Sequence, residues 1–228
     1  MSNRLPVHGF VLAGGKSTRM GEDKALMPFC GTPLIELAVE KLGAFCAEVG
    51  IAGNREDLAS YGAVVQELRL EWGPAAGIEA ALMAAQLPWV LCIPVDVPLV
   101  PAEVLRRWVE RVIGAEDEVL DGSYLVAEGQ PQPTFCLLRR ECLALWSGML
   151  ETGERRLTSL LRQIEVRGRG SVRPFDVEGV AGCAGFEVTL IAQWFWNLNT
   201  PLEMAAAEAL VVGTERDRNA HGGTRCDG

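Results

Sequence analysis

A glycine-rich segment near the start of the chain carries the strongest chemical signal. An apolar, strand-like stretch leads into LAGGKSTRMGEDK at residues 12–24. Its glycines let backbone amides turn toward an anion without a Cβ in the way, and Arg19 and Lys24 add positive charge beside them. The spacing matches neither G-x-x-x-x-G-K-S/T nor G-x-G-x-x-G. The segment predicts a phosphate-binding loop; the alternative is a surface turn with two solvated cations.

A carboxylate follows a second apolar run. Residues 89–95 are continuously apolar, which is typical of a buried parallel strand, and Asp96 comes directly after them. At the carboxyl edge of a parallel sheet, such a carboxylate can hold Mg²⁺ through one oxygen and leave positions for phosphates and water. Aspartate before an apolar residue and proline is also a common turn residue. Both interpretations stay open on this motif alone.

Two asparagines precede a strongly marked helix start. In WNLNTPLE, Thr200 suits the helix cap, Pro201 the first turn, and Glu203 closes a capping box. The amide oxygens of Asn197 and Asn199 suit a hard cation. Cap chemistry alone already explains Thr200, so the alternative is a purely local turn.

Two further segments could contribute weaker contacts. The turn GPAAG at residues 73–77 leads into an alanine-rich helix, and its small side chains would let a base or ribose approach the backbone. Arg155 and Arg156 could bind an anionic acceptor, although adjacent arginines on a loop are more often solvated. His8 and His221 lack convincing partners, so we assign neither a catalytic role.

These residues need a scaffold, and the hydrophobic pattern predicts one. Apolar runs typical of strands and periodic patterns typical of helices alternate in the first half of the chain. Strands are expected at residues 9–13, 49–52, 63–65, 89–95, 119–126, 134–138 and 172–175. Helices are expected at residues 33–45, 75–85, 101–113, 143–150 and 157–164. The order predicts a three-layer α/β fold with a mostly parallel central sheet and a mixed edge, with ligands at the carboxyl ends of the strands.

Length and composition set further limits. The 228 residues are 49% hydrophobic and 22% charged, as in an ordinary globular enzyme, and we expect one domain over residues 1–212 and a polar, disordered tail at 213–228. A net charge of -9 argues against a nucleic-acid partner. No apolar run is long enough for a membrane span, and the first ten residues lack a signal-peptide pattern. The seven scattered cysteines form no C-x-x-C pair, which favours structural thiols in the cytoplasm.

Taken in order, the motifs resemble the molybdenum cofactor guanylyltransferases. LAGGKSTRMGEDK is typical of the wider nucleotidyltransferase superfamily, and GPAAGI, VDVP, GQPQPTF, TGERR and NLNTP narrow the resemblance, which runs from about residue 9 to about residue 207. The resemblance implies a Rossmann-like nucleotidyltransferase fold that binds GTP and Mg²⁺. It implies that the terminal phosphate of molybdopterin attacks the α-phosphorus, releasing pyrophosphate. Further partners would be other cofactor-biosynthesis proteins or acceptor molybdoenzymes.

The resemblance also implies roles for individual residues. Catalytic roles fall on Arg19, Lys24 and Asp96. Metal ligands would be Asp96 and Asn199, and acceptor contacts would come from Gln132, Arg155 and Arg156. Contacts to the nucleotide would come from Leu12, Ala13, Gly14, Gly15, Lys24, Asn54, Glu67 and Asp96.

Three positions depart from the family pattern. Ala52 stands where the family commonly has asparagine, with Asn54 as a nearby substitute; Glu67 replaces the usual aspartate, and Gln132 replaces a histidine. The first two positions fall where base and ribose are read. Alternatives are therefore a cytidylyltransferase that uses CTP or, from another class, a non-catalytic nucleotide-binding module, although the intact phosphate loop argues against the latter. A sugar-phosphate nucleotidyltransferase is disfavoured because that class tends to be longer.

Overall fold

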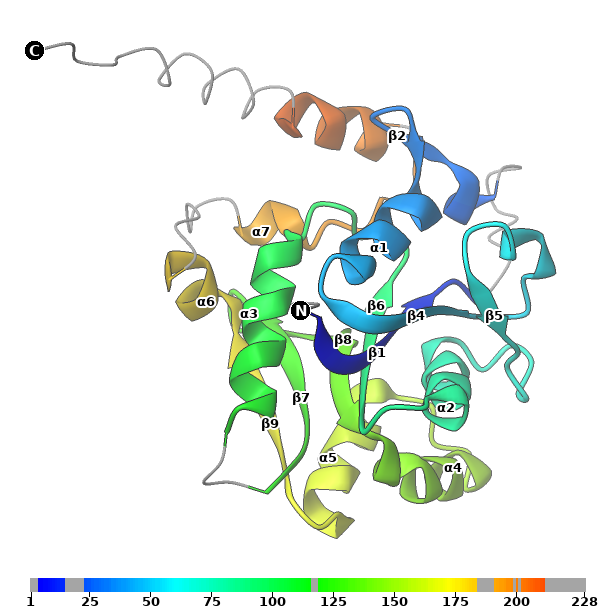
Figure 1. Cartoon of the computed structure of the whole chain (residues 1–228), viewed down its shortest axis with the longest axis vertical. Coiled ribbons are helices and arrows are strands. Elements are labelled where there is room, and N and C mark those ends of the chain that lie inside the picture. Colours follow the sequence, from blue (N-terminus) through cyan, green and yellow to red (C-terminus); the bar gives the residue numbers. More distant parts are fainter. Residues whose placement is uncertain are drawn as a thin grey trace, which may run out of the picture.

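A seven-stranded sheet forms the middle layer of the molecule (Figure 1). The computed structural model describes residues 4–14, 23–115, 119–183, 191–198, 200 and 202–211. In spatial order the strands are β5 (Ala63–Val65), β4 (Cys46–Ala52), β1 (Leu5–Leu12), β6 (Trp89–Pro94), β8 (Gln130–Arg139), β7 (Leu120–Ala127) and β9 (Ser171–Asp176). All neighbours are parallel except where β8 pairs with β6 and β7. The expected mostly parallel sheet with a mixed edge is confirmed.

Helices cover both faces of this sheet (Figure 1). One face packs against α1 (Leu34–Gly43), α3 (Ala102–Ile113), α6 (Val177–Cys183) and α7 (Ile191–Trp194). The other face packs against α2 (Pro74–Ala84), α4 (Leu143–Glu151) and α5 (Leu157–Arg167). Because both faces are covered, the central strand β6 is buried along almost its whole length, which explains its unbroken apolar sequence.

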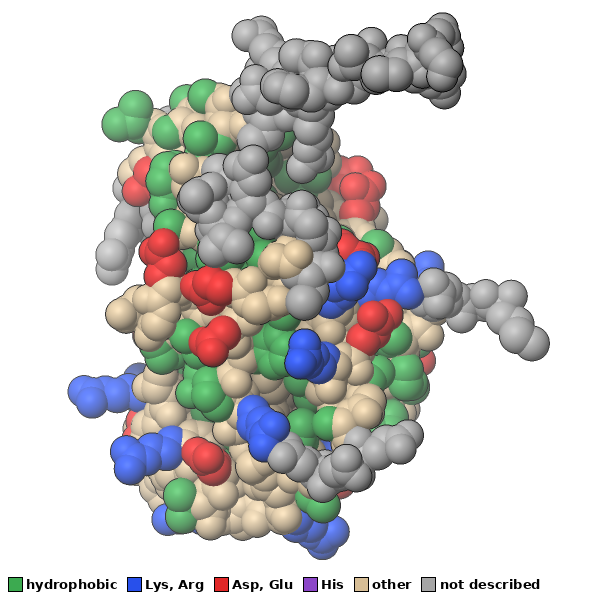
Figure 2. Space-filling model, turned by 90° about the vertical axis from the view of Figure 1, so that its left-hand side faces the viewer, with side chains coloured by type: hydrophobic (Ala, Val, Ile, Leu, Met, Phe, Trp, Pro, Cys, Tyr) green, Lys and Arg blue, Asp and Glu red, His purple; other side chains and the backbone are tan. Residues whose placement is uncertain are grey.

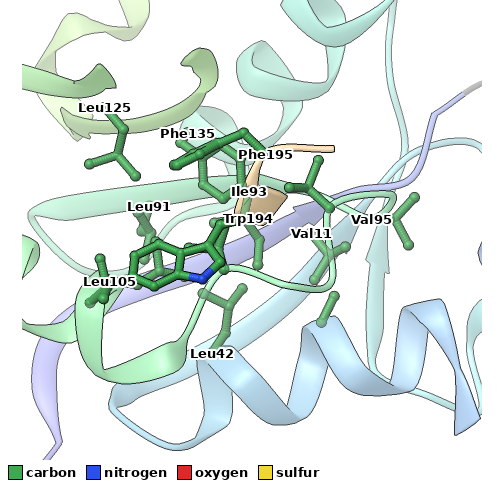
Figure 3. Close-up of a cluster of buried hydrophobic side chains, with 14 of the residues drawn as sticks. Val11, Leu42, Leu91, Ile93, Val95, Leu105, Leu125, Phe135, Trp194 and Phe195 are labelled. Atoms are coloured by element: carbon green, nitrogen blue, oxygen red, sulfur yellow. The ribbon is translucent and has the colours of Figure 1, made fainter. Parts of the chain in front are cut away.

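The core on the α1 and α3 side reaches the segment that follows α7. Figure 3 shows Trp194 and Phe195 among Val11, Ile93 and Phe135 of the sheet. The rings of Phe135 and Phe195 meet edge to face, with centroids 5.3 Å apart. This packing fixes the backbone just before Asn197 against the end of β6.

Several short elements escape prediction from the sequence. These are the hairpin β2 (Pro28–Phe29) and β3 (Thr32–Pro33), helices α6 and α7, and the 3-10 helices η2 (Lys24–Leu26), η3 (Glu56–Leu58) and η4 (Arg140–Cys142). Elements this short are too small to show a hydrophobic period. The expected helix start at Thr200 is confirmed, since Thr200 Oγ1 accepts from Glu203 N at 3.1 Å ahead of a helix over residues 202–211. The predicted tail at 213–228 lies outside the described residues.

The surface mixes charges of both signs. Figure 2 shows the side of the molecule where α3 and α6 lie, with Lys and Arg side chains interspersed among Asp and Glu. In the part of the chain that the structure describes, no helix has the length and apolar character needed to cross a membrane. The described cysteines are free thiols: Cys30, Cys46, Cys92, Cys136 and Cys142.

Lys41 interrupts the apolar face of α1, and its contact explains why. Its Nζ donates to the carbonyl oxygen of Pro98 at 2.7 Å. Burial lowers the pKa of Lys41 to about 7. Pro98 lies two residues after Asp96, so this lysine supports the loop that carries the predicted metal ligand, and burying its charge costs stability.

Lys41→Met is therefore expected to stabilise the protein at neutral and acidic pH. The pKa of Lys41 falls from 10.5 to about 7 in the folded chain, so the unfolded chain binds the extra proton between these pH values and stability rises with pH there. Below this pH range the free energy of unfolding of the variant should exceed that of wild type by about 2 kcal/mol. The full pKa shift would correspond to roughly 5 kcal/mol, but the Lys41 side chain is partly exposed and the variant loses its hydrogen bond to Pro98.

Urea unfolding of both proteins at about pH 6, 8 and 10 checks this prediction. The difference in the free energy of unfolding between variant and wild type should become smaller toward the highest pH. The pH effects of other groups are the same in both proteins and cancel in this difference. A Lys41→Met protein that is no more stable than wild type at the lowest pH would contradict it.

Candidate active site

The carboxyl ends of four parallel strands line up at one edge of the sheet. The strand register pairs Leu12 with both Ala52 and Pro94, and Ala52 with Val65. From β1 the chain first adds β4 and β5 on one side and then β6 on the other. A reversal of this kind leaves a crevice in which α/β proteins bind ligands. The segments that follow these four strands therefore meet in one place.

A cavity of about 440 Å³ opens at this edge, a size suited to a small-molecule ligand. It collects predicted residues from segments far apart in the sequence. The predicted residues on its wall are Leu12, Ala13, Gly14, Lys24, Glu67 and Asp96. Its other lining residues are Ala25, Arg55, Gly73, Pro74, Gly77, Pro94, Val95, Thr134 and Asn197. The glycine-rich loop, the turn before α2 and the end of β6 thus form a single site.

Lys24 and Asp96 form an ion pair inside this cavity. Lys24 Nζ lies 2.5 Å from Asp96 Oδ2, and the two side chains are 17% and 21% exposed. Asp23 places the lysine, because its side chain accepts from Ala25 N at 3.1 Å and caps η2. The Asp96 backbone is held by Leu198, whose N–H donates to the Asp96 carbonyl at 3.0 Å. Two residues predicted to act on phosphates and metal are therefore in direct contact.

Glu67 lies across the glycine of the phosphate loop. A Cβ on Gly14 would overlap the Glu67 carboxylate, and a Cβ on Gly77 would come within 3.3 Å of Glu67 Oε1. Burial raises the pKa of Glu67 above its ordinary value. Asn54 fixes the backbone at this position: Glu67 N donates to Asn54 Oδ1 at 3.0 Å, and Asn54 Nδ2 donates to the Glu67 carbonyl at 3.4 Å. The amide of Asn54 is thus engaged with Glu67 beside the cavity, and its nucleotide contact remains a prediction.

The backbone at Ala52 and Gly53 packs closely against the backbone that follows β1. Ala13 N donates to the Ala52 carbonyl at 2.9 Å. Gly53 has φ 154°. A Cβ at Gly53 would lie 2.9 Å from the nitrogen of Gly14, so a side chain there would collide with the phosphate loop. This contact ties the loop after β4 to the loop after β1.

The donor set of the cavity fits a magnesium ion that is held mainly by its substrate. Asp96 and Glu67 are the carboxylates on the described wall, and no cluster of three or more His, Cys, Asp or Glu occurs among the residues the structure describes. Mg²⁺ is usually held by one or two carboxylates together with phosphates and water. Asn197 lines the cavity beside Asp96. Gly15, Arg19 and Asn199 fall outside the described residues, so their roles remain predictions.

The predicted acceptor residues Gln132, Arg155 and Arg156 are not among the described residues that line the cavity, so their roles remain predictions. Arg155 is exposed, with its guanidinium carbon 4.1 Å from the ring centroid of Trp72. Trp72 precedes Gly73 of the cavity wall. Glu154 Oε1 accepts from the backbone nitrogens of Arg155 and Arg156, both at 2.9 Å. The stacking thus brings Arg155 next to the residue that precedes the cavity wall, while the Glu154 bonds hold the backbone of the segment itself.

Arg55 and Thr134 line the cavity in addition to the predicted residues, and the predicted Gln132 lies close to Thr134 in the sequence. Gln132 is partly buried on β8, two residues before Thr134, which lines the cavity. Arg55 also lines the cavity and was not among the predicted site residues. Its position directly after Asn54, at the end of a strand that reaches this edge, is the sequence signal that could have identified it.

A second hollow lies at the far edge of the sheet. It measures about 430 Å³ and is lined by residues of α3, β9 and α6, including Arg111, Arg173 and Phe175. None of the residues predicted for the site is among its described lining. Of these two cavities, the first is therefore the one whose described lining includes predicted site residues.

A family model and individual related sequences assign the chain to the same family. The sequence model of the "MobA-like NTP transferase domain" matches residues 9–167. The molybdenum cofactor guanylyltransferase of Bordetella pertussis is 32% identical over 167 residues, which cover 68% of this chain and 82% of the relative. That of Polynucleobacter asymbioticus is 31% identical over 209 residues, which cover 89% of this chain and 96% of the relative.

Comparison with solved structures gives the fold. Molybdopterin-guanine dinucleotide biosynthesis protein A from Archaeoglobus fulgidus has a TM-score of 0.69 at 24% identity, covering 90% of this chain and 99% of that one. A 4-diphosphocytidyl-2C-methyl-D-erythritol synthase from Anaerococcus prevotii has a TM-score of 0.63 at 12% identity, covering 90% of this chain and 95% of that one. Both likenesses show a Rossmann-like nucleotidyltransferase fold.

Proposed function

Since the chain belongs to the MobA-like NTP transferase family, and within it to the molybdenum cofactor guanylyltransferases, we propose that it transfers GMP from GTP to the terminal phosphate of molybdopterin. The products are the guanine dinucleotide form of the cofactor and pyrophosphate. The observation that carries this proposal is the contact between Lys24 and Asp96 in the cavity beside Gly14. A triphosphate bound with Mg²⁺ requires a cation beside its oxygens and a carboxylate that can hold the metal.

The chemistry requires alignment and charge neutralisation rather than a strong base. An oxygen of the acceptor phosphate forms a bond to the α-phosphorus of GTP while the bond from that phosphorus to the departing pyrophosphate breaks. The attacking phosphate is already anionic at neutral pH, so no side chain must remove a proton. Among the described residues that line the cavity there is no histidine. Lys24 would neutralise charge on the phosphates while the backbone at Gly14 orients them.

Asp96 is the residue proposed to hold Mg²⁺, and the amide oxygens of Asn197, which lines the same cavity, and of Asn199 are proposed as further ligands. When bound, the ion would supply positive charge for the phosphate oxygens and the leaving pyrophosphate. Lys24 Nζ lies 2.5 Å from Oδ2 of the same carboxylate in the structure. The lysine and the ion would therefore share the neutralisation of one anionic region.

We propose that Arg155, Arg156 and Gln132 contact the acceptor. The stacking of Arg155 on Trp72, at 4.1 Å, keeps a cation next to the turn that lines the cavity, and an anionic acceptor would be attracted there. We further propose a cytoplasmic location, because the described cysteines are free thiols, as is usual in a reducing compartment. Other cofactor-biosynthesis proteins or molybdoenzymes would receive the product.

The preference for GTP over CTP can be tested at a single residue, Glu67. Wild type is expected to prefer GTP over CTP by at least about tenfold in kcat/KM, the scale of one unmatched polar contact of roughly 1–3 kcal/mol. Glu67→Ala should narrow this ratio, because the half-buried carboxylate beside Gly14 and Gly77 is positioned to read the nucleotide. Glu71→Ala, in the same loop but exposed, is the matched control and should leave the ratio unchanged.

Steady-state kinetics with both nucleotides decide the question. A Glu67→Ala protein with the wild-type GTP-to-CTP ratio would remove Glu67 from base reading. A wild-type preference for CTP would instead make the protein a cytidylyltransferase.

The proposed reaction itself is tested by the release of pyrophosphate. Release should require GTP, Mg²⁺ and molybdopterin together, and omission of any one of them should abolish it. Release of pyrophosphate without molybdopterin would contradict transfer to that acceptor.

A further inference from the structure

Arg55 is the most deeply buried charged residue on the described wall of the cavity, and its side chain bonds to two aspartates that are not among the lining residues. It is 2% exposed, although it lies among the lining residues. Its Nη1 donates to Asp23 Oδ1 at 3.0 Å, and its Nη2 also donates to Asp23 Oδ2. On its other side, Nε donates to Asp57 Oδ1 at 2.9 Å and Nη2 to Asp57 Oδ2 at 2.7 Å. One guanidinium thus bridges two carboxylates from different segments.

We propose that Arg55 is a positioning residue for the nucleotidyl transfer, one that acts through Asp23 to hold Lys24 against the phosphates. This inference rests on the proposed function. Nothing in the family comparison assigns the role; the contacts of the three side chains carry it.

The alternative role for Arg55, direct binding of phosphate, fits its surroundings poorly. Two carboxylates and one guanidinium give the cluster a net charge of about -1, which does not attract a triphosphate. The carboxylates already occupy Nε and Nη2 and take one bond from Nη1, leaving little donor capacity for a ligand. The guanidinium therefore serves to hold chain segments together.

The segment that Arg55 holds leads directly to the reacting groups. Asp23 caps η2 through Ala25 N, and η2 begins at Lys24. Lys24 Nζ in turn lies 2.5 Å from Asp96 Oδ2. Only the lysine side chain separates the anchored backbone from the contact with Asp96, so movement of Asp23 would displace the amine.

Arg55 itself sits on a rigid support. Its N–H donates to the Gly53 carbonyl at 2.9 Å, and its carbonyl accepts from Leu58 N at 2.9 Å. Gly53 N in turn donates to the Val65 carbonyl at the end of β5, at 3.0 Å. Through these bonds, Arg55 holds the start of η2 in a fixed position relative to the edge of the sheet.

Arg55→Lys tests this bridge while it keeps the positive charge. A single ammonium cannot bond two carboxylates in the paired geometry of a guanidinium. Because a displacement of about 1 Å can cost about a hundredfold in rate, kcat should fall by about ten- to a hundredfold while KM for GTP changes less than about threefold. Arg139→Lys is the matched control: Arg139 stacks on Trp89 at 4.3 Å and lies at the opposite end of β6, so kcat should stay at the wild-type value.

The decisive measurement repeats Arg55→Lys in a protein that already carries Lys24→Ala. If Arg55 acts through Lys24, the second substitution should reduce kcat no further, whereas an independent structural effect would multiply with the first. Asp23→Asn, which leaves Arg55 paired with Asp57, provides the same comparison even if Arg55→Lys does not fold. Multiplying losses, or a wild-type kcat in Asp23→Asn, would overturn the proposal.

Two kinds of failure can be told apart in this experiment. Wild-type protein assayed alongside with GTP and molybdopterin must form product; without product there, the proposed function fails. Product from wild type together with multiplying losses in the double variants refutes the role of Arg55 alone.

Discussion

Asp96→Asn is expected to lower kcat by at least about a thousandfold, equivalent to about 4 kcal/mol of transition-state stabilisation. Asp96 lies two residues after the buried strand β6, inside the cavity, and is in contact with Lys24. The substitution preserves size but removes the charge that would hold Mg²⁺ and pair with the lysine. Because Asp96 is partly exposed and its backbone bond to Leu198 is unaffected, the fold should survive.

Steady-state rates across a range of Mg²⁺ concentrations, with thermal unfolding alongside, check this expectation. Asp176→Asn is the matched control, since Asp176 ends β9 at the same end of the sheet but lies at the far edge, away from the cavity. It should retain wild-type kcat. A near-normal kcat in a folded Asp96→Asn protein would mean that Asp96 does not hold the metal.

Lys24→Ala is expected to lower kcat by about a hundredfold or more, with a smaller change in KM for GTP. The lysine sits where negative charge builds up on the phosphates, and charge that develops in the transition state is stabilised more than charge present in the ground state. Its loss also leaves Asp96 without the cation that lies 2.5 Å from it in the structure.

Lys24→Met separates the role of the charge from that of the side chain's bulk. It keeps most of the apolar stem, so it should behave like Lys24→Ala if the ammonium matters, and Lys24→Arg should recover part of the rate. Steady-state kinetics that show only a raised KM in the uncharged variants would reduce Lys24 to a ground-state binding residue.

The sequence alone could predict the parts of the site that lie where regular strands end. Gly14 and Asp96 follow long apolar runs, and the alternation of strands and helices predicts that such ends meet at one edge. The contact between Lys24 and Asp96 could not be predicted, because η2 is too short to show a period and its position depends on Asp23.

Side chains that bind neighbouring backbone were also beyond prediction. Asn54 reads as a nucleotide contact in the sequence, yet in the structure its amide bonds to the backbone of Glu67 in both directions. Lys41 interrupts the apolar face of α1 in the sequence, and only the structure shows that its side chain bonds to the carbonyl of Pro98. The bridge made by Arg55 could not be predicted from the sequence, since one of its two partners, Asp23, lies 32 residues before it. Such contacts depend on tertiary structure rather than on spacing along the chain.

The central claim is that this site joins a guanylyl group to molybdopterin, and the identity of the product tests it most directly. The protein should be incubated with Mg²⁺, molybdopterin and an equal mixture of the four nucleoside triphosphates, and the pterin products separated and weighed by mass spectrometry. We expect the guanine dinucleotide as the main product, with pyrophosphate released in equal amount. A cytosine dinucleotide as the main product, or molybdopterin recovered unchanged, would contradict it.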